Sequence, residues 1–216
     1  MIRHLLAPHV PAAARALDVP LRLPLEGIAL TFDDGPHPEG TPAVLEVLAA
    51  AGARATFFLV GEQVERRPAL AAEIAAAGHA VAVHGFRHRL QLRLKASTVE
   101  GDVRRGAAVI EDATGVRPVW HRPPYGLYSR AGLEVARAAG LNPLLWSRWG
   151  KDWRKLTTAA RIARRVTGGG LTAGDVILLH DADFYSSRNS HRLTVEALPA
   201  ILGELRTRKL DTVLPV

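Results

Sequence analysis

The chain has 216 residues, of which 48% are hydrophobic and 23% are charged, a size and composition typical of one globular domain with a substantial core. The absence of cysteine excludes disulfides, thiolate metal ligands and a cysteine nucleophile. The formal net charge is +7, but the basic residues are scattered, and no zinc-finger, RNA-recognition or helix-turn-helix pattern occurs, so we expect no nucleic-acid partner.

The first 25 residues contain four prolines and one candidate for a short helix, at 11–17. We expect residues 1–25 to be a leader that packs onto a catalytic domain spanning 26–216. Their apolar run is too short for a secretory signal, and no stretch approaches the ~18 apolar residues of a membrane span. This favours a cytoplasmic location, and a cell-wall location if a leader has been trimmed away.

From residue 26 onward, short apolar strands alternate with helical segments about seven times. We predict strands at 27–32, 54–60, 79–83, 118–121, 141–147, 175–180 and 212–216. We predict helices at 42–51 (capped by Thr41 and closed by Gly52), 61–67 and 68–77 (one interrupted helix or two), 97–113 (capped by Ser97), 129–139, 157–166 and 191–206. The alternation predicts parallel βα units, and both a (β/α) barrel and an open sheet fit it.

Two adjacent carboxylates follow the first strand, in Thr31-Phe32-Asp33-Asp34-Gly35-Pro36. Two like charges at about 4 Å repel each other by roughly 1 kcal/mol in water, and by more as the site dries. A cation bound by one of them gives the two carboxylates separate roles. Asp, Gly and Pro are also common in turns, so the alternative is a hydrated acidic turn without a catalytic role.

Two imidazoles lie four residues apart after the third strand, in His84-Gly85-Phe86-Arg87-His88. Over one helical turn both rings point the same way, which suits two ligands of one metal. With Asp34 they form the two-histidine, one-carboxylate set of many catalytic zinc or other divalent-metal sites. Two ordinary surface histidines are the alternative.

Three further motifs follow later strands. Two prolines stiffen the loop Arg122-Pro123-Pro124-Tyr125-Gly126. Its arginine can form a bidentate ion pair with the Asp33 carboxylate, and a purely structural role in the turn is the alternative. Trp146, Trp149 and Trp153 lie near the carboxylate of Asp152 in the sequence. Such tryptophans can form a wall on which a sugar stacks, or they can serve ordinary packing. A buried strand ends at His180, where a lone histidine is more often structural than catalytic.

Together and in this order, these motifs resemble those of the polysaccharide deacetylases of carbohydrate esterase family 4, which include chitin, chitooligosaccharide and peptidoglycan deacetylases. The resemblance extends from about Gly27 to the C-terminus. It implies an α/β fold that is a distorted (β/α) barrel, generally seven-stranded, in a single domain, and a divalent metal, usually Zn²⁺, with Co²⁺, Ni²⁺ or Mn²⁺ possible. The motifs that carry it are Thr31–Pro36, His84–His88, Arg122–Gly126, Asp152-Trp153 and Leu178-Leu179-His180.

The resemblance also assigns roles to individual residues. It implies that Asp33 is the general base and that Asp34, His84 and His88 bind the metal. Arg122 is expected to orient Asp33.

Five more roles concern the acetyl group and the leaving amine. The resemblance implies that the backbone N–H of Tyr125, with the metal, stabilises the oxyanion. His180 is expected to be the general acid, with its charge supported by Asp152. Leu178 and Trp153 are expected to line the pocket for the acetyl methyl group.

We therefore expect a metal-dependent hydrolase that removes N-acetyl groups from amino sugars, acting on a non-peptide C–N bond. The alternatives are an amidohydrolase of a small non-polymeric acetamide and a catalytically silent carbohydrate-binding relative. One position departs from the family: the second motif usually has serine or threonine after its first histidine, and here Gly85 stands there.

Overall fold

Seven parallel strands form one curled sheet in the computed structural model, which describes residues 2–215. The strand order is β5-β4-β3-β2-β1-β7-β6, so β5 and β6 stand at the two edges and the barrel does not close. This confirms the expected distorted, seven-stranded barrel in a single α/β domain. The strands are β1 (Ala29–Asp33), β2 (Thr56–Leu59), β3 (Ala80–Val83), β4 (Trp120–His121), β5 (Asn142–Pro143), β6 (Arg148–Trp149) and β7 (Val176–His180).

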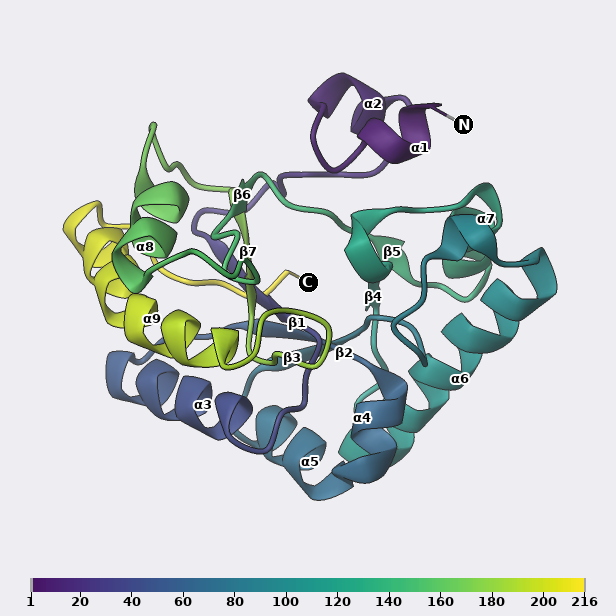
Figure 1. Cartoon of the computed structure of the whole chain (residues 1–216), viewed down its shortest axis with the longest axis horizontal. Helices are drawn as coiled ribbons and strands as arrows, with labels where there is room; N and C mark the ends of the chain where they lie inside the picture. The colour runs from purple at the N-terminus through teal and green to yellow at the C-terminus, as the bar shows by residue number, and fades with distance from the viewer. Residues whose placement is uncertain (1, 216) are drawn as a thin grey trace.

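Helices cover the convex side of the sheet (Figure 1). They include α3 (Gly40–Ala51), α4 (Gly61–Arg66), α5 (Pro68–Ala76), α6 (Ala96–Thr114), α7 (Arg130–Ala138), α8 (Ala159–Thr167) and α9 (Ser190–Thr207). Two shorter helices, α1 (Ile2–Leu6) and α2 (Pro11–Arg15), precede the sheet. Among the helices of residues 2–215, none is both long and apolar enough to cross a membrane.

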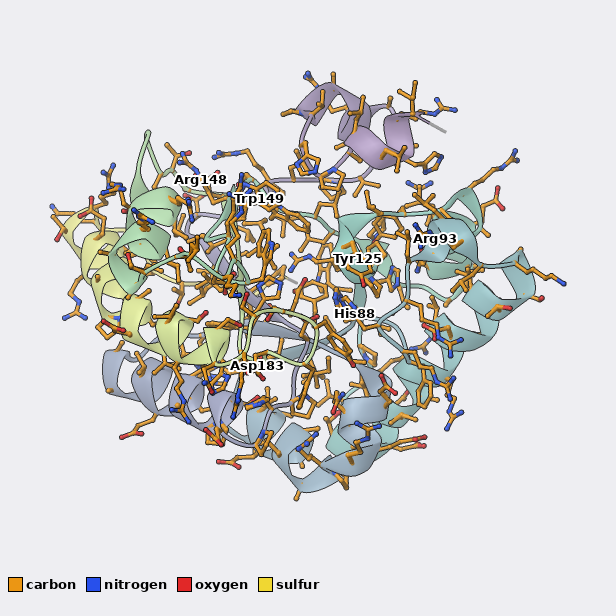
Figure 2. The ribbon with its side chains drawn as sticks, in the orientation of Figure 1. His88, Arg93, Tyr125, Arg148, Trp149 and Asp183 are labelled. Atoms are coloured by element: carbon orange, nitrogen blue, oxygen red, sulfur yellow. The ribbon has the colours of Figure 1, made fainter. Side chains whose placement is uncertain are left out.

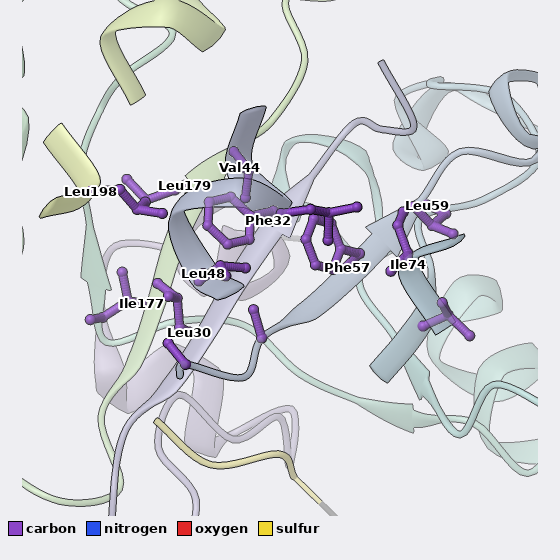
Figure 3. Close-up of a cluster of buried hydrophobic side chains, with 14 of the residues drawn as sticks. Leu30, Phe32, Val44, Leu48, Phe57, Leu59, Ile74, Ile177, Leu179 and Leu198 are labelled. Carbon is purple, nitrogen blue, oxygen red and sulfur yellow. The ribbon is translucent and has the colours of Figure 1, made fainter. Parts of the chain in front are cut away.

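The larger part of the core lies between the sheet and these outer helices (Figure 3). Alternate strand residues point outward because successive side chains of a strand face opposite sides of the sheet. Phe32 of β1 stacks on Phe57 of β2 with ring centroids 5.2 Å apart, and Val44 and Leu48 of α3 pack in the same cluster. The residues between the outward-facing ones therefore line the concave side, where the strands carry the predicted site.

The N-terminal segment, residues 2–25, covers part of the concave side. Ala7, Ala14 and Val19 are buried in a second apolar cluster with inward-facing strand residues such as Phe58 and Leu178. The backbone N–H groups of residues 145 and 23 donate to the carbonyls of residues 20 and 174, at 3.0 and 2.9 Å. The segment thus packs on the sheet. The division of the chain into a leader and a catalytic domain at residue 25 stays a prediction. Residues 1 and 216 lie outside the described part of the chain.

Several predicted boundaries were wrong. The segment 141–147 contributes only the two residues of β5. Strand β6 was not predicted, because its two residues are too few to show the alternation of apolar and polar side chains that marks a strand. Only Thr212 of the expected strand 212–216 pairs in the described residues, by one bridge to Ile28. Helix α6 begins at Ala96 with Lys95 as its N-cap, so Ser97 does not cap it.

The start of α3 was also mispredicted. The helix begins at Gly40, and Glu39 is its N-cap. The hydroxyl of Thr41 instead accepts a hydrogen bond from the backbone N–H of His37 and donates one to the carboxylate of Asp181. The other end agrees with the prediction, since Gly52 closes the helix in the left-handed conformation with φ of 62°.

Candidate active site at the carboxyl ends of the strands

A cavity of about 500 Å³ opens at the carboxyl ends of the strands. Figure 2 shows two of its lining side chains, His88 and Tyr125, near the centre of the molecule. Two more predicted residues, Arg122 and Asp152, are fully buried beside it. The fold therefore gathers all ten predicted site residues at one place. The predicted residues that line the cavity are Asp33, Asp34, His84, His88, Tyr125, Trp153, Leu178 and His180.

The three predicted metal ligands meet around one carboxylate oxygen. Oδ1 of Asp34 lies 3.4 Å from Nε2 of His84 and 3.3 Å from Nε2 of His88. This oxygen is buried and has no hydrogen-bond partner among the described residues. Nδ1 of His84 lies 2.9 Å from the carbonyl oxygen of Arg122, which can only accept, so Nδ1 carries the proton and Nε2 offers its lone pair toward Asp34. The three side chains thus fit a divalent cation.

The protonation states of these groups also suit metal binding, because ligands must bind in their deprotonated forms. Burial raises the pKa of Asp34, but its close contact with His84 and the charges of the nearby imidazoles outweigh burial and lower the pKa to about 2. Burial lowers the pKa of His88 to about 4, although the Asp34 carboxylate opposes this shift. At neutral pH Asp34 is therefore ionised and His88 neutral.

The two histidines do not share a helical turn, which corrects the argument from their spacing. Residues 84–88 form a loop after β3, and Gly85 has a φ of +84°. The rings approach each other because the loop turns back at this glycine, with ring centroids of His84 and His88 5.4 Å apart.

Asp33 is held by an arginine on one oxygen, while Nδ1 of His84 lies 3.9 Å from its other oxygen, Oδ2. Its Oδ1 accepts a hydrogen bond from Nη1 of Arg122 at 2.6 Å, and the arginine is fully buried. The same guanidinium donates to the hydroxyl of Thr31 at 2.9 Å and to the carbonyls of Leu144 and Leu145 at 3.3 and 3.0 Å. Its planar fork is thus fixed by four acceptors, which holds the Asp33 carboxylate in one orientation.

On the adjacent strand β7, His180 is the register partner of Asp33 and is held by Asp152. Nδ1 of His180 lies 2.9 Å from Oδ1 of Asp152, whose other oxygen accepts from the backbone N–H of His180 and from the hydroxyl of Thr194. Burial lowers the pKa of His180, but the charge and hydrogen bond of Asp152 outweigh it and raise the pKa to about 10. His180 is therefore protonated at neutral pH, with Trp153 edge-on at 5.4 Å.

Tyr125 projects from the stiff loop that the two prolines predict. It lies in a short 3₁₀ turn, Pro124–Gly126, and has a φ of +62°, which is uncommon for a residue other than glycine. The residue is 56% exposed at the rim of the cavity. The role of its backbone N–H at the oxyanion stays a prediction.

Several residues of the cavity were not predicted to line it. Tyr185, from the loop between β7 and α9, stacks on His88, and the N-terminal segment contributes Leu5 and His9. These three positions follow no strong sequence pattern, because each reaches the cavity only through the tertiary fold. Trp149 of β6, by contrast, is one of the tryptophans near Asp152 that the sequence offers as a wall, and its ring centroid lies 5.2 Å from that of His9 and 5.4 Å from that of Trp153.

A second group, His37, Asp183 and His191, also lies close enough together to hold a metal. However, Nδ1 of His37 accepts hydrogen bonds from the backbone N–H groups of Glu39 and Gly40, at 3.2 and 2.9 Å. The proton of a neutral His37 is therefore on Nε2, which faces Oδ1 of Asp183 at 3.3 Å. Because Nδ1 already accepts two hydrogen bonds and Nε2 carries the proton, a neutral His37 has no free lone pair for a metal.

Comparison with known proteins gives consistent similarities. The sequence profile described as polysaccharide deacetylase matches residues 23–144. A peptidoglycan-N-acetylglucosamine deacetylase of Bacillus cereus is 35% identical over 83% of this chain and 81% of its own length. A chitooligosaccharide deacetylase of Azorhizobium caulinodans is 34% identical over 84% of this chain and 89% of its own length.

Two further comparisons concern length and fold. The chain spans 41% of the length of the peptidoglycan-N-acetylglucosamine deacetylase PgdA of Listeria monocytogenes, to which it is 31% identical over 95% of its own length. A family 4 carbohydrate esterase from Streptomyces lividans, solved in complex with acetate, superimposes with a TM-score of 0.78 at 29% identity, covering 88% of this chain and 93% of that one.

Proposed function

Because the chain belongs to the polysaccharide deacetylase family, we propose that it is a metal-dependent hydrolase that removes N-acetyl groups from amino sugars. Relatives that act on peptidoglycan and on chitooligosaccharides support an amino-sugar substrate of one of these two types. The observation that carries the proposal is the difference between two adjacent carboxylates. Arg122 holds Asp33, whereas the buried Oδ1 of Asp34 lacks a hydrogen-bond partner among the described residues and faces two histidines.

In this proposal Asp34, His84 and His88 hold the cation, most readily Zn²⁺ given two imidazoles and one carboxylate, with Co²⁺, Ni²⁺ or Mn²⁺ as substitutes. When bound, such a cation lowers the pKa of water toward about 7 and polarises a carbonyl oxygen. Asp33 is not a ligand in this arrangement. It takes the proton of the attacking water as general base, in the orientation that Arg122 fixes.

The remaining residues act on the acetamide. The backbone N–H of Tyr125 donates a hydrogen bond to the oxygen that becomes negatively charged. His180 is protonated at neutral pH and gives its proton to the departing sugar amine, while Asp152 supports its charge. Trp153 and Leu178 enclose the acetyl methyl group.

Acetate release from chitooligosaccharides and from peptidoglycan fragments, with and without a chelator, tests this function. We expect activity on at least one of these substrates, loss of activity on chelation, and recovery when Zn²⁺ or Co²⁺ is added back. Asp34→Ala and His84→Ala should remove the bound metal. Full metal occupancy in either variant by elemental analysis, or activity that chelation leaves unchanged, would overturn the proposal.

A control on the same protein separates metal loss from general damage. Asp112 is exposed on α6, and Asp112→Ala should keep both metal and activity. A metal-loaded wild-type protein that releases no acetate from either polymer would point instead to a small acetamide or to a silent relative.

A further inference from the structure

His88 and His84, the two proposed histidine ligands, are held in different ways. Nδ1 of His84 has the carbonyl of Arg122 as its partner. The side chain of His88 is only 6% exposed, so water does not readily reach it. Its Nδ1 is buried and has no hydrogen-bond partner among residues 2–215. Metal-binding histidines almost always donate their second ring N–H to an acceptor that fixes the ring. Something else must therefore set the orientation of His88.

Two aromatic rings enclose His88. Tyr185 stacks on it in parallel, with ring centroids 4.1 Å apart and planes 7° apart. Tyr125 meets it edge-on at 4.7 Å and 66° (Figure 2 shows His88 and Tyr125). A stacked face and a perpendicular edge together restrict both the tilt and the rotation of the imidazole.

The stacking tyrosine is itself fixed. Its hydroxyl donates to Oε1 of Glu62 at 3.0 Å and accepts from Nε2 of Gln63 at 3.1 Å. Both partners lie in the first turn of α4. Tyr185 is therefore tied to the rigid part of the fold although it projects from a loop.

The backbone before His88 is held by a residue from another helix. The carboxylate of Asp102, on α6, accepts hydrogen bonds from the backbone N–H groups of Phe86 and Arg87, at 2.9 and 3.0 Å. On the other side, the first two N–H groups of α4, at Gly61 and Glu62, donate to the carbonyls of residues 85 and 86 at 3.0 and 2.8 Å. The loop between the two histidines is thus bound from both sides.

This arrangement accounts for the departure at Gly85. A Cβ atom built at Gly85 would lie 2.7 Å from Oδ2 of Asp102, closer than real Cβ contacts allow. The family's usual serine or threonine and the Asp102 carboxylate therefore compete for the same space. The carboxylate takes the place of the missing hydroxyl.

We propose that Asp102 and Tyr185 are positioning residues for His88: Asp102 fixes the backbone of the metal-binding loop, and stacking on Tyr185 fixes the imidazole ring. The inference rests on the metal site proposed above. Loss of a residue that orients a ligand typically weakens metal binding by about 10–100-fold. We expect losses of this size from Asp102→Ala and from Tyr185→Leu.

The test measures the affinity of the 216-residue protein for Zn²⁺ by competition with a chromophoric chelator, and the visible absorption of its Co²⁺ form. Tyr185→Leu should weaken Zn²⁺ binding and alter the Co²⁺ spectrum, which reports ligand geometry. Tyr185→Phe keeps the stacked ring and loses only the two hydrogen bonds of the hydroxyl, so its loss should be smaller. Asp102→Asn keeps one acceptor and should lie between wild type and Asp102→Ala.

Asp112→Ala is the matched control, because it removes an exposed aspartate from the same helix and should leave affinity and spectrum unchanged. The folding of each variant is checked by circular dichroism. If Asp102→Ala does not fold, the metal affinity of Asp102→Asn tests the role of Asp102 instead. Wild-type affinity and spectrum in folded Tyr185→Leu and in the Asp102 variants would overturn the inference. A wild-type protein that binds neither metal would overturn the proposed function itself.

Discussion

Nη1 of Arg122 lies 2.6 Å from Oδ1 of Asp33, and neither side chain is more than 4% exposed. The guanidinium fixes one oxygen of Asp33 and leaves Oδ2 without a hydrogen bond among the described residues. In the proposed mechanism Asp33 acts as base while Asp34 binds the cation. The contact with Arg122 then accounts for the different roles proposed for two adjacent carboxylates.

Replacing the proposed base should leave metal binding intact. In Asp33→Asn the amide oxygen still accepts from Arg122, and the three proposed metal ligands are unchanged. We expect kcat for acetate release to fall by roughly 10²-fold or more, the usual scale of general base catalysis. Metal content should stay equal to that of wild type by elemental analysis. Near-normal turnover would show that another group takes the proton.

Arg122→Ala should lower the free energy of unfolding by about 3–5 kcal/mol, because it leaves the buried Asp33 carboxylate without its cation. Urea denaturation gives the value. Arg104→Ala is the control, since Arg104 pairs with Glu100 on the surface and is 55% exposed, so its effect should be below about 1 kcal/mol. Equal effects of the two substitutions would contradict a structural role for the buried pair.

The pKa of His180 should be about 10 in the metal-free protein, measurable by NMR titration of its ring. Because this folded-state pKa is above the unfolded value of 6.5, the interaction with Asp152 stabilises the fold fully below pH 6.5, and the stabilisation is lost as pH rises through about 10. Asp152→Asn removes the opposing charge and should lower the pKa. An unchanged pKa in this variant would rule out Asp152 as its cause.

The pH dependence of activity should follow from the same residue. An acid works only while protonated, so kcat should fall on the alkaline side as His180 loses its proton. A bound cation lowers the pKa of His180, so the alkaline limb of the activity profile should lie at a lower pH than the midpoint of the metal-free NMR titration. His180→Ala should lower turnover and remove the limb. A bell-shaped profile that persists in His180→Ala would reject the acid role.

Restoring the family's hydroxyl should harm this protein. Gly85 has a φ of +84° and no room for a Cβ atom beside Asp102, so Gly85→Ser should destabilise the fold by about 1–3 kcal/mol and weaken metal binding. Gly101→Ala is the matched control, since it lies on α6 with nothing within 4 Å of its added Cβ and should stabilise by about 0.5–1 kcal/mol. Tighter metal binding in Gly85→Ser would contradict the geometry.

The sequence predicts the long central strands well and the edge strands poorly. Strands β1, β2, β3 and β7 have four or five residues each and are mostly apolar, and each was predicted to within two residues at either end. Strands β5 and β6 have two residues each, which is too short for any periodic signal. Their place in the sheet depends on pairing with β4 and β7, which is not encoded locally.

The same distinction holds at the site. The ten predicted residues lie in motifs at strand ends, where parallel strands bring them to one edge of the sheet. Asp102 and Tyr185 escaped prediction because one is a single acidic residue on an amphipathic helix and the other lies in a loop. Their contacts with the loop of His88 exist only after α6 and the segment after β7 are in place.

The wall of the cavity and its chemistry come from different parts of the chain. The proposed base, acid and ligands lie at the carboxyl ends of strands and in the loops that follow them, whereas Leu5 and His9 belong to the N-terminal segment, before the family profile match begins at residue 23. Substitutions in this segment would therefore change the shape of the cavity without touching the residues proposed to remove the acetyl group. The residues that select a substrate and the residues that react with it can then be altered independently in this chain.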